Sequence, residues 1–164
     1  MKMAKTESLK FLLESVPVRI MGPQEVLNTI PHRYPFLMVD AVSVIEERKY
    51  AVGRKCVTLT EPCFQGHFPG HPVMPGVMTL ESMAQTCAAA VMSLDEFRGG
   101  MAYFLGIDNA KFRQQVVPGN VLLLAIEIMR LGRIGKGRGQ AFVNGEVVAE
   151  ADMTYAFARR AENE

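Results

Sequence analysis

Residues 76–95 constrain the fold most, because they form the only long stretch of helical composition in the chain and are apolar nearly all round. After Gly76 this stretch contains no glycine or proline, and it is dense in methionine, leucine and alanine. A helix without a wide polar face has to be surrounded by other elements. Most of the remaining sequence has strand composition, so we expect an α+β domain in which a sheet wraps one central helix.

Segments rich in Val, Ile, Leu and Thr lie on both sides of this helix. Those with the composition of strands are residues 36–46, 51–60, 101–107, 109–116 and 121–131. The clearest strand is the last one, since residues 146–157 alternate apolar and polar positions and Asn144-Gly145 supplies a two-residue hairpin turn before them. A short helix opened by a proline is predicted at residues 23–30.

The composition limits the number of domains and the classes of partner. With 164 residues, of which 49% are apolar and 21% charged, the chain suits one domain with a sizeable core. A net charge of +1 gives no global reason to expect nucleic acid or a membrane surface as a partner. Cys56, Cys63 and Cys87 form no CxxC pair, so we expect reduced thiols in a cytoplasmic protein. Polar residues within the long helix, among them Glu81, favour a buried core helix over a transmembrane span.

A stiff loop with a histidine leads directly into the long helix. Residues 66–76 read GHFPGHPVMPG, and each of the three prolines fixes a backbone φ angle and removes a hydrogen-bond donor. Such stiffness suits a loop that has to aim a base, and the imidazole of His67 needs little tuning for that role near neutral pH.

The start of the helix adds an acid and a set of backbone donors. The first amide N–H groups of a helix have no helical partner, and Gly76 lets a ligand approach them closely, so a carbonyl oxygen placed there would be polarised. Glu81 and Gln85 are four residues apart and share a helix face, where Gln85 can fix the carboxyl group. Base, acid and oxyanion donor together suit removal of a proton next to a carbonyl, coupled to loss of a β-hydroxyl group.

Other chemistries fit these residues less well. His67 and His71 are four apart, as in helical zinc motifs, but Pro69 and Gly70 make a helix between them improbable. Cys63 as a nucleophile has no evident activating partner beyond His67. Each component also has a purely structural interpretation, since a lone loop histidine is commonly solvated and Gly76 alone marks only a helix start.

Basic residues gather near the end of the chain. Arg130, Arg133, Lys136 and Arg138 have no acid among them. A solvated face is the simplest interpretation of any one of them, but a basic rim beside an apolar pocket would suit a substrate delivered on an acidic carrier.

Several of these motifs resemble one known family, the 3-hydroxyacyl-[acyl-carrier-protein] dehydratases of FabZ type. The similarity extends over about residues 22–158 and is carried by the segments 32–40 (HRYPFLMVD), 66–76, 81–85 (ESMAQ), 107–113 (IDNAKFR) and 116–120 (VVPGN). The resemblance implies a hotdog fold, an antiparallel sheet around a long helix, as a single domain. Residues 1–21 are then an N-terminal extension of unknown role, in which neither a signal nor a transit peptide is expected, and residues 159–164 are a C-terminal tail.

The resemblance also implies an activity and assigns roles to residues. In the family the histidine at the position of His67 is the catalytic base and the acid at the position of Glu81 is its partner, on different subunits of a homodimer. Larger family assemblies are usually trimers of dimers. The N–H of Gly76 would hold the thioester carbonyl, and no metal or organic cofactor is needed. The sister FabA-type enzymes, which also isomerise the double bond, usually carry Asp where this chain has Glu81, which favours the dehydratase.

The implied substrate is a (3R)-3-hydroxyacyl thioester on acyl carrier protein, with the acyl chain in an apolar tunnel. Tyr103 and Phe104 are candidates to line or gate the tunnel mouth, although core packing explains them equally well. The four basic residues named above are candidates to dock the carrier protein. A hotdog thioesterase and a non-catalytic acyl-chain binding protein remain as alternatives, since both would share the fold and the pocket.

Overall fold

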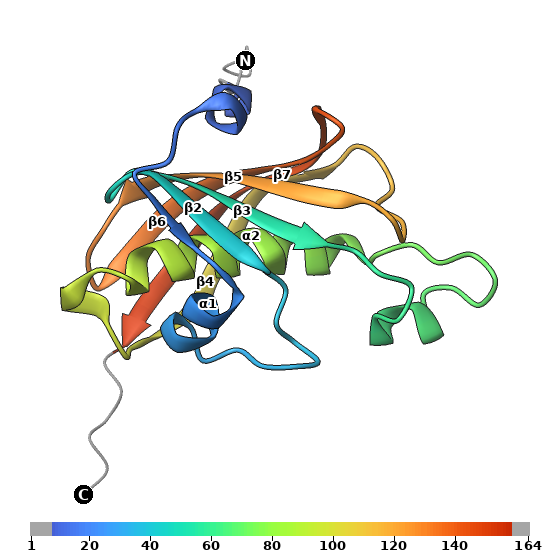
Figure 1. The fold of residues 1–164 in the computed structure, drawn as a ribbon, viewed down its shortest axis with the longest axis horizontal. Helices are drawn as coiled ribbons and strands as arrows, with labels where there is room; N and C mark the ends of the chain where they lie inside the picture. Colours follow the sequence, from blue (N-terminus) through green and yellow to red (C-terminus); the bar gives the residue numbers. More distant parts are fainter. Residues whose placement is uncertain (1–7, 159–164) are drawn as a thin grey trace, which may run out of the picture.

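The computed structural model describes residues 8–158, in which one antiparallel sheet curves around one long helix (Figure 1). Its strands are β1 (Arg19–Met21), β2 (Ala41–Glu46), β3 (Tyr50–Cys56), β4 (Met101–Phe112), β5 (Val121–Arg130), β6 (Ile134–Val143) and β7 (Glu146–Ala158). Their order in the sheet is β1-β2-β3-β5-β6-β7-β4, so β1 and β4 form the two edges. The predicted hotdog arrangement is confirmed.

The central helix α2 (Gly76–Met92) lies against the concave face of the sheet (Figure 1). Every residue from Ser82 to Met92 is buried, which explains why the sequence offers no polar face there. Strand β6 can approach α2 closely because glycines face the helix: a Cβ at Gly139 would lie 2.8 Å from the sulfur of Met83. None of the helices in residues 8–158 is long and apolar enough to cross a membrane.

Four short helices complete the fold: η1 (Lys10–Glu14) precedes β1, and α1 (Pro23–Thr29), η2 (Pro62–Gln65) and η3 (Asp95–Phe97) lie between later elements; the three η helices are 3₁₀. Helix α1 was predicted at residues 23–30 and is confirmed to within one residue. The predicted hairpin at Asn144-Gly145 is also confirmed, since both residues have positive φ angles and Val143 pairs with Glu146.

Several boundaries differ from the sequence prediction: the strand predicted at residues 51–60 ends at Cys56, and the helix predicted at residues 76–95 ends at Met92. Residues 101–107 and 109–116 were predicted as separate strands, but they form the single strand β4 as far as Phe112, with a bulge between Asp108 and Lys111 where Asn109 has a φ of 55°. Strand β2 begins at Ala41 instead of residue 36, because the segment before it bonds to α2: the backbone of Phe36 and of Met38 pairs with the side chain of Gln85.

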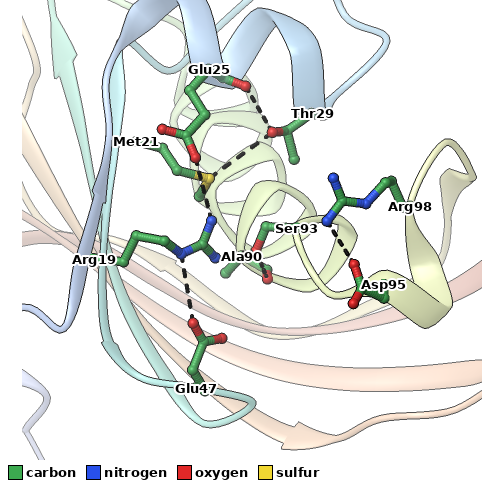
Figure 2. A network of polar contacts seen from close by, with 9 residues as sticks. All are labelled: Arg19, Met21, Glu25, Thr29, Glu47, Ala90, Ser93, Asp95 and Arg98. Atoms are coloured by element: carbon green, nitrogen blue, oxygen red, sulfur yellow. Dashed lines mark hydrogen bonds and ion pairs between the residues drawn. The ribbon is translucent and has the colours of Figure 1, made fainter.

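The C-terminal end of α2 is tied to the first strand and to α1 by a polar network (Figure 2). Arg19 of β1 donates a hydrogen bond of 2.6 Å to Ser93, the residue after α2, and lies 3.4 Å from the Glu25 carboxylate. Glu47 completes the set at 3.6 Å from the guanidinium group. This network fixes the end of α2 that lies away from the histidine loop.

Part of the N-terminal extension packs on the face of the sheet opposite to α2 (Figure 1). Leu9 and Leu12 join Ala125 of β5 and Phe142 of β6 in a small second core, and all four side chains are buried. The backbone N–H of Leu9 donates to Gln140 at 2.7 Å. The described part of the extension is therefore a structural cover for the outer face of the sheet.

Leu12→Ala is expected to lower the free energy of unfolding by about 3 kcal/mol, because it empties a buried site next to Phe142. The kcat should not change, since this core lies across the sheet from α2. Urea unfolding compared with Val16→Ala, at a side chain that is 86% exposed, measures the effect. Equal unfolding midpoints for the two variants would show that the extension is not a structural cover.

Candidate active site

The proline-rich loop holds His67 by hydrogen bonds from both sides. The N–H of His67 donates to the carbonyl of Cys63 at 2.9 Å, and the N–H of Val73 donates to the carbonyl of His67 at 3.0 Å. The imidazole Nδ1 lies 2.6 Å from the carbonyl oxygen of Val73. A carbonyl oxygen only accepts, so Nδ1 carries the proton and Nε2 of the neutral ring keeps its lone pair. The loop thus presents His67 as a base.

His67 lines a cavity of about 530 Å³ at the start of α2. Its walls include Gly76, Thr79, Phe112, Arg113 and Val148. Phe112 of β4 lies directly over Gly76, where a Cβ atom would be 2.7 Å from the phenyl ring, so a glycine is required. As the first residue of α2, Gly76 also presents an N–H that no helical carbonyl reaches. A base and a backbone donor therefore face the same cavity.

Glu81 is held on another face of α2 by a set of hydrogen bonds. Gln85 Nε2 donates to Glu81 Oε1 at 2.8 Å, the contact that the four-residue spacing predicts. Gln85 is itself fixed by the segment before β2, accepting from the N–H of Met38 at 2.7 Å and donating to the carbonyl of Phe36 at 2.8 Å. The carboxyl group is thus oriented by a fully bonded neighbour.

The structure adds His32 to this group, a residue that sequence reasoning did not single out. Its Nε2 lies 3.6 Å from Glu81 Oε1, and its buried Nδ1 has no partner among the described residues. Burial lowers the pKa of His32 and outweighs the opposing effect of the Glu81 carboxylate, so the ring is neutral near pH 7. The only sequence signal for His32 is its place after Pro31, at the start of the HRYPFLMVD segment.

In one chain His67 and Glu81 open into different cavities. Glu81 lines a small hollow of about 30 Å³ with His32 and Phe104, and this hollow shares no lining residue with the His67 cavity. Glu81 follows Gly76 by five residues, which turns its side chain about 140° around the helix axis. A single chain therefore does not bring the predicted base and acid to one face of α2.

Of the two aromatic residues predicted at the tunnel mouth, one lies beside Glu81. Phe104 lines the Glu81 hollow and stacks on Tyr155, with ring centroids 5.5 Å apart. Tyr103, the next residue back on β4, lines neither the His67 cavity nor the Glu81 hollow and is half exposed.

The four predicted docking residues divide into two groups. Arg130 and Lys136 face each other across β5 and β6, and Arg133 lies in the turn between these strands, at the edge of a cavity of about 960 Å³ that contains neither His67 nor Glu81. Arg138 lies farther along β6, in an ion pair of 2.8 Å with Glu127.

Neither Cys63 nor Cys87 carries an activated thiol in this structure. Burial raises the pKa of the Cys87 thiol to about 12, as suits a core residue. Burial and the nearby Glu61 carboxylate raise the pKa of Cys63, which is the opposite of what a nucleophile next to His67 needs. Within residues 8–158, no group of three or more His, Cys, Asp or Glu side chains is placed to hold a metal ion.

Comparison with known proteins agrees with the fold and identifies the family. The FabA-like domain matches residues 30–152. A 3-hydroxyacyl-[acyl-carrier-protein] dehydratase FabZ from Pelotomaculum thermopropionicum is 53% identical over 80% of this chain and 95% of its own length. The Bacillus subtilis FabZ is 50% identical over 84% of this chain and 98% of its own length.

Solved structures resemble the chain in fold at low sequence identity. The dehydratase heterocomplex ApeI:P from Xenorhabdus doucetiae superposes with a TM-score of 0.73 at 17% identity, covering 84% of this chain and 93% of that one. The PaaI protein of E. coli, from the phenylacetic acid degradation operon, superposes with a TM-score of 0.52 at 18% identity over 68% of this chain and 78% of its own. These structures show the shared fold, and the matches in sequence place the chain in the FabA-like domain family, where it belongs to the 3-hydroxyacyl-[acyl-carrier-protein] dehydratases of FabZ type.

Proposed function

We propose that this chain catalyses the reversible dehydration of (3R)-3-hydroxyacyl-acyl-carrier-protein to the trans-2-enoyl thioester, a step of type II fatty-acid biosynthesis. The observation that carries the proposal is the tautomer of His67, because the bond of Nδ1 to the Val73 carbonyl leaves the Nε2 lone pair available in a ring that lines the cavity beside Gly76. Membership of the FabZ-type family supports the same reaction.

The site residues divide the reaction between them. His67 Nε2 removes the proton from C2, and the N–H of Gly76 stabilises the negative charge that develops on the thioester oxygen. The electron pair of the C2–H bond forms the C2=C3 double bond as the C3–O bond breaks. Glu81 protonates the departing hydroxyl, which leaves as water, and proton transfer to solvent and back restores both side chains. Gln85 keeps the Glu81 carboxyl in place throughout.

Each complete site would combine His67 of one subunit with Glu81 of another. The edge strand β4 exposes a row of large apolar side chains: Tyr103, Phe104, Leu105, Ile107 and Phe112. Such an edge favours pairing with a second copy, which would extend the sheet. The separation of the two cavities within one chain supports this homodimer, and we propose a trimer of dimers as the larger assembly.

The carrier protein would dock at the basic rim. Acyl carrier protein is the acidic partner that Arg130, Arg133, Lys136 and Arg138 would meet, with the first three nearest the β5–β6 turn. Tyr103 and Phe104 on β4 would line or gate the tunnel that the acyl chain enters. We place the hotdog domain at residues 22–158 and the protein in the cytoplasm, where its three unpaired cysteines stay reduced.

A spectrophotometric assay with 3-hydroxyacyl and 2-enoyl thioesters on acyl carrier protein tests the function. A dehydratase changes the enoyl absorbance in both directions and releases no thiol. Release of free thiol without a change in the enoyl signal would identify a thioesterase instead. Binding of the thioester with neither change would identify an acyl-chain binding protein.

A further inference from the structure

A largely buried ion pair lies at the base of the loop that carries His67, with the Glu61 side chain 17% exposed. Lys55 of β3 has an exposed fraction of 5%, the lowest of any charged residue among residues 8–158. Its Nζ contacts the carboxylate of Glu61. The loss of hydration of these two largely buried charges offsets much of their attraction, so such a pair is weak support for stability alone. The position of the pair below the His67 loop indicates a role other than stability.

The lysine side of the pair is fixed to the end of β3. Lys55 Nζ also donates to the carbonyl of Cys56 at 3.1 Å, and the carboxylate of Asp40 accepts from the N–H of Cys56 at 2.6 Å. Asp40 is in turn bonded through its own N–H to the carbonyl of Arg54 at 2.8 Å. The ammonium group of Lys55 is therefore held against the last residue of a central strand.

The glutamate side of the pair leads to His67 through one helical turn. Glu61 is the residue before η2, and its carbonyl accepts from the N–H of Phe64 at 3.1 Å. Within η2 the carbonyl of Cys63 accepts from the N–H of His67 at 2.9 Å. The far side of the loop is fixed separately, since the N–H of Met74 donates to Val116 at 2.7 Å. The Lys55–Glu61 pair thus fixes the N-terminal side of the loop that carries His67.

We infer that the Lys55–Glu61 ion pair positions His67 for proton abstraction, an inference that rests on the role proposed for His67 above. Neither residue lines the His67 cavity or the Glu81 hollow, so both are positioning residues that act through η2. A shift of the base by about 1 Å can slow a reaction about a hundredfold. Loss of the pair should therefore lower the turnover rate more than it lowers the stability of the fold.

Three variants separate positioning from stability: Lys55→Met, Glu61→Gln and the double variant. Each single variant leaves one charge of the pair without its partner and should lower the Tm, Glu61→Gln the more because Lys55 is the more buried of the two. The double variant removes both charges and should recover most of the Tm. All three should show a kcat about ten- to a hundredfold below wild type, with KM within about twofold. In the proton NMR spectrum the His67 Nδ1–H signal should shift or broaden in all three.

Arg19→Met is the matched control, because it removes a half-buried cation from the network at the other end of α2 (Figure 2). It should lower the Tm and leave kcat and the His67 signal unchanged. A double variant with the wild-type kcat and His67 signal would overturn the inference, and so would a raised KM at unchanged kcat. Full turnover by His67→Ala would instead refute the proposed function. In that case the His67 Nδ1–H signal of the Lys55 and Glu61 variants would still show whether the ion pair positions the imidazole. If the single variants fail to fold, the kcat and the His67 signal of the double variant test the inference.

Discussion

His67→Ala is expected to lower the kcat for dehydration by about a thousandfold or more, while KM stays within about twofold. The imidazole Nε2 is the only group in the His67 cavity whose lone pair the loop geometry leaves available as a base, because the Val73 carbonyl occupies Nδ1. Alanine keeps the backbone bonds of His67 to Cys63 and Val73, so the cavity itself should persist.

The measurement is steady-state formation of the enoyl thioester from 3-hydroxyacyl-acyl-carrier-protein, with circular dichroism to verify folding. His71→Ala is the matched control, since His71 lies in the same loop but is exposed and lines neither the His67 cavity nor the Glu81 hollow. Its kcat should stay near that of the wild type. Turnover by His67→Ala at the rate of His71→Ala would exclude the imidazole as the base.

Glu81→Gln is expected to lower the kcat by about a hundredfold to ten-thousandfold, because an amide cannot protonate the departing hydroxyl group. The substitution keeps the size of the side chain, so packing against Gln85 and His32 should change little. Glu81→Asp keeps an acid on a shorter side chain and should retain more activity than Glu81→Gln. The kcat and KM of both variants, with thioester binding measured separately, test this order.

Glu47→Gln is the control for the loss of a carboxylate, because Glu47 lies in the network at the opposite end of α2 (Figure 2). It should leave kcat unchanged. A Glu81→Gln variant as active as Glu47→Gln would contradict an acid role for Glu81, whatever the effect of His67→Ala. Equal activity of Glu81→Asp and Glu81→Gln would instead assign Glu81 a purely steric role.

The elements that the sequence predicted well are those set by local composition. The α2 segment has no helix breaker after Gly76, and Asn144-Gly145 forces a tight hairpin, so each pattern has one physical solution. The bulge at Asn109 was missed because it depends on the pairing of β4 with β7, which no local pattern encodes.

The candidate site was predictable where its members are close in sequence. Glu81 and Gln85 are one helical turn apart, and their hydrogen bond follows from that spacing. His32 reaches Glu81, and Asp40 reaches Cys56, only through the packing of the segment before β2 onto α2 and β3. Such contacts between distant segments require the three-dimensional fold.

The most direct test co-expresses His67→Ala and Glu81→Ala copies carrying different affinity tags and assays the mixed oligomer for enoyl formation. A site shared between two subunits predicts about a quarter to a half of the wild-type turnover, because one site of each mixed dimer keeps both residues. Each variant alone should be nearly inactive. A mixed oligomer no more active than either variant alone would contradict the shared site, and with it the proposal that His67 and Glu81 of different subunits act in one site.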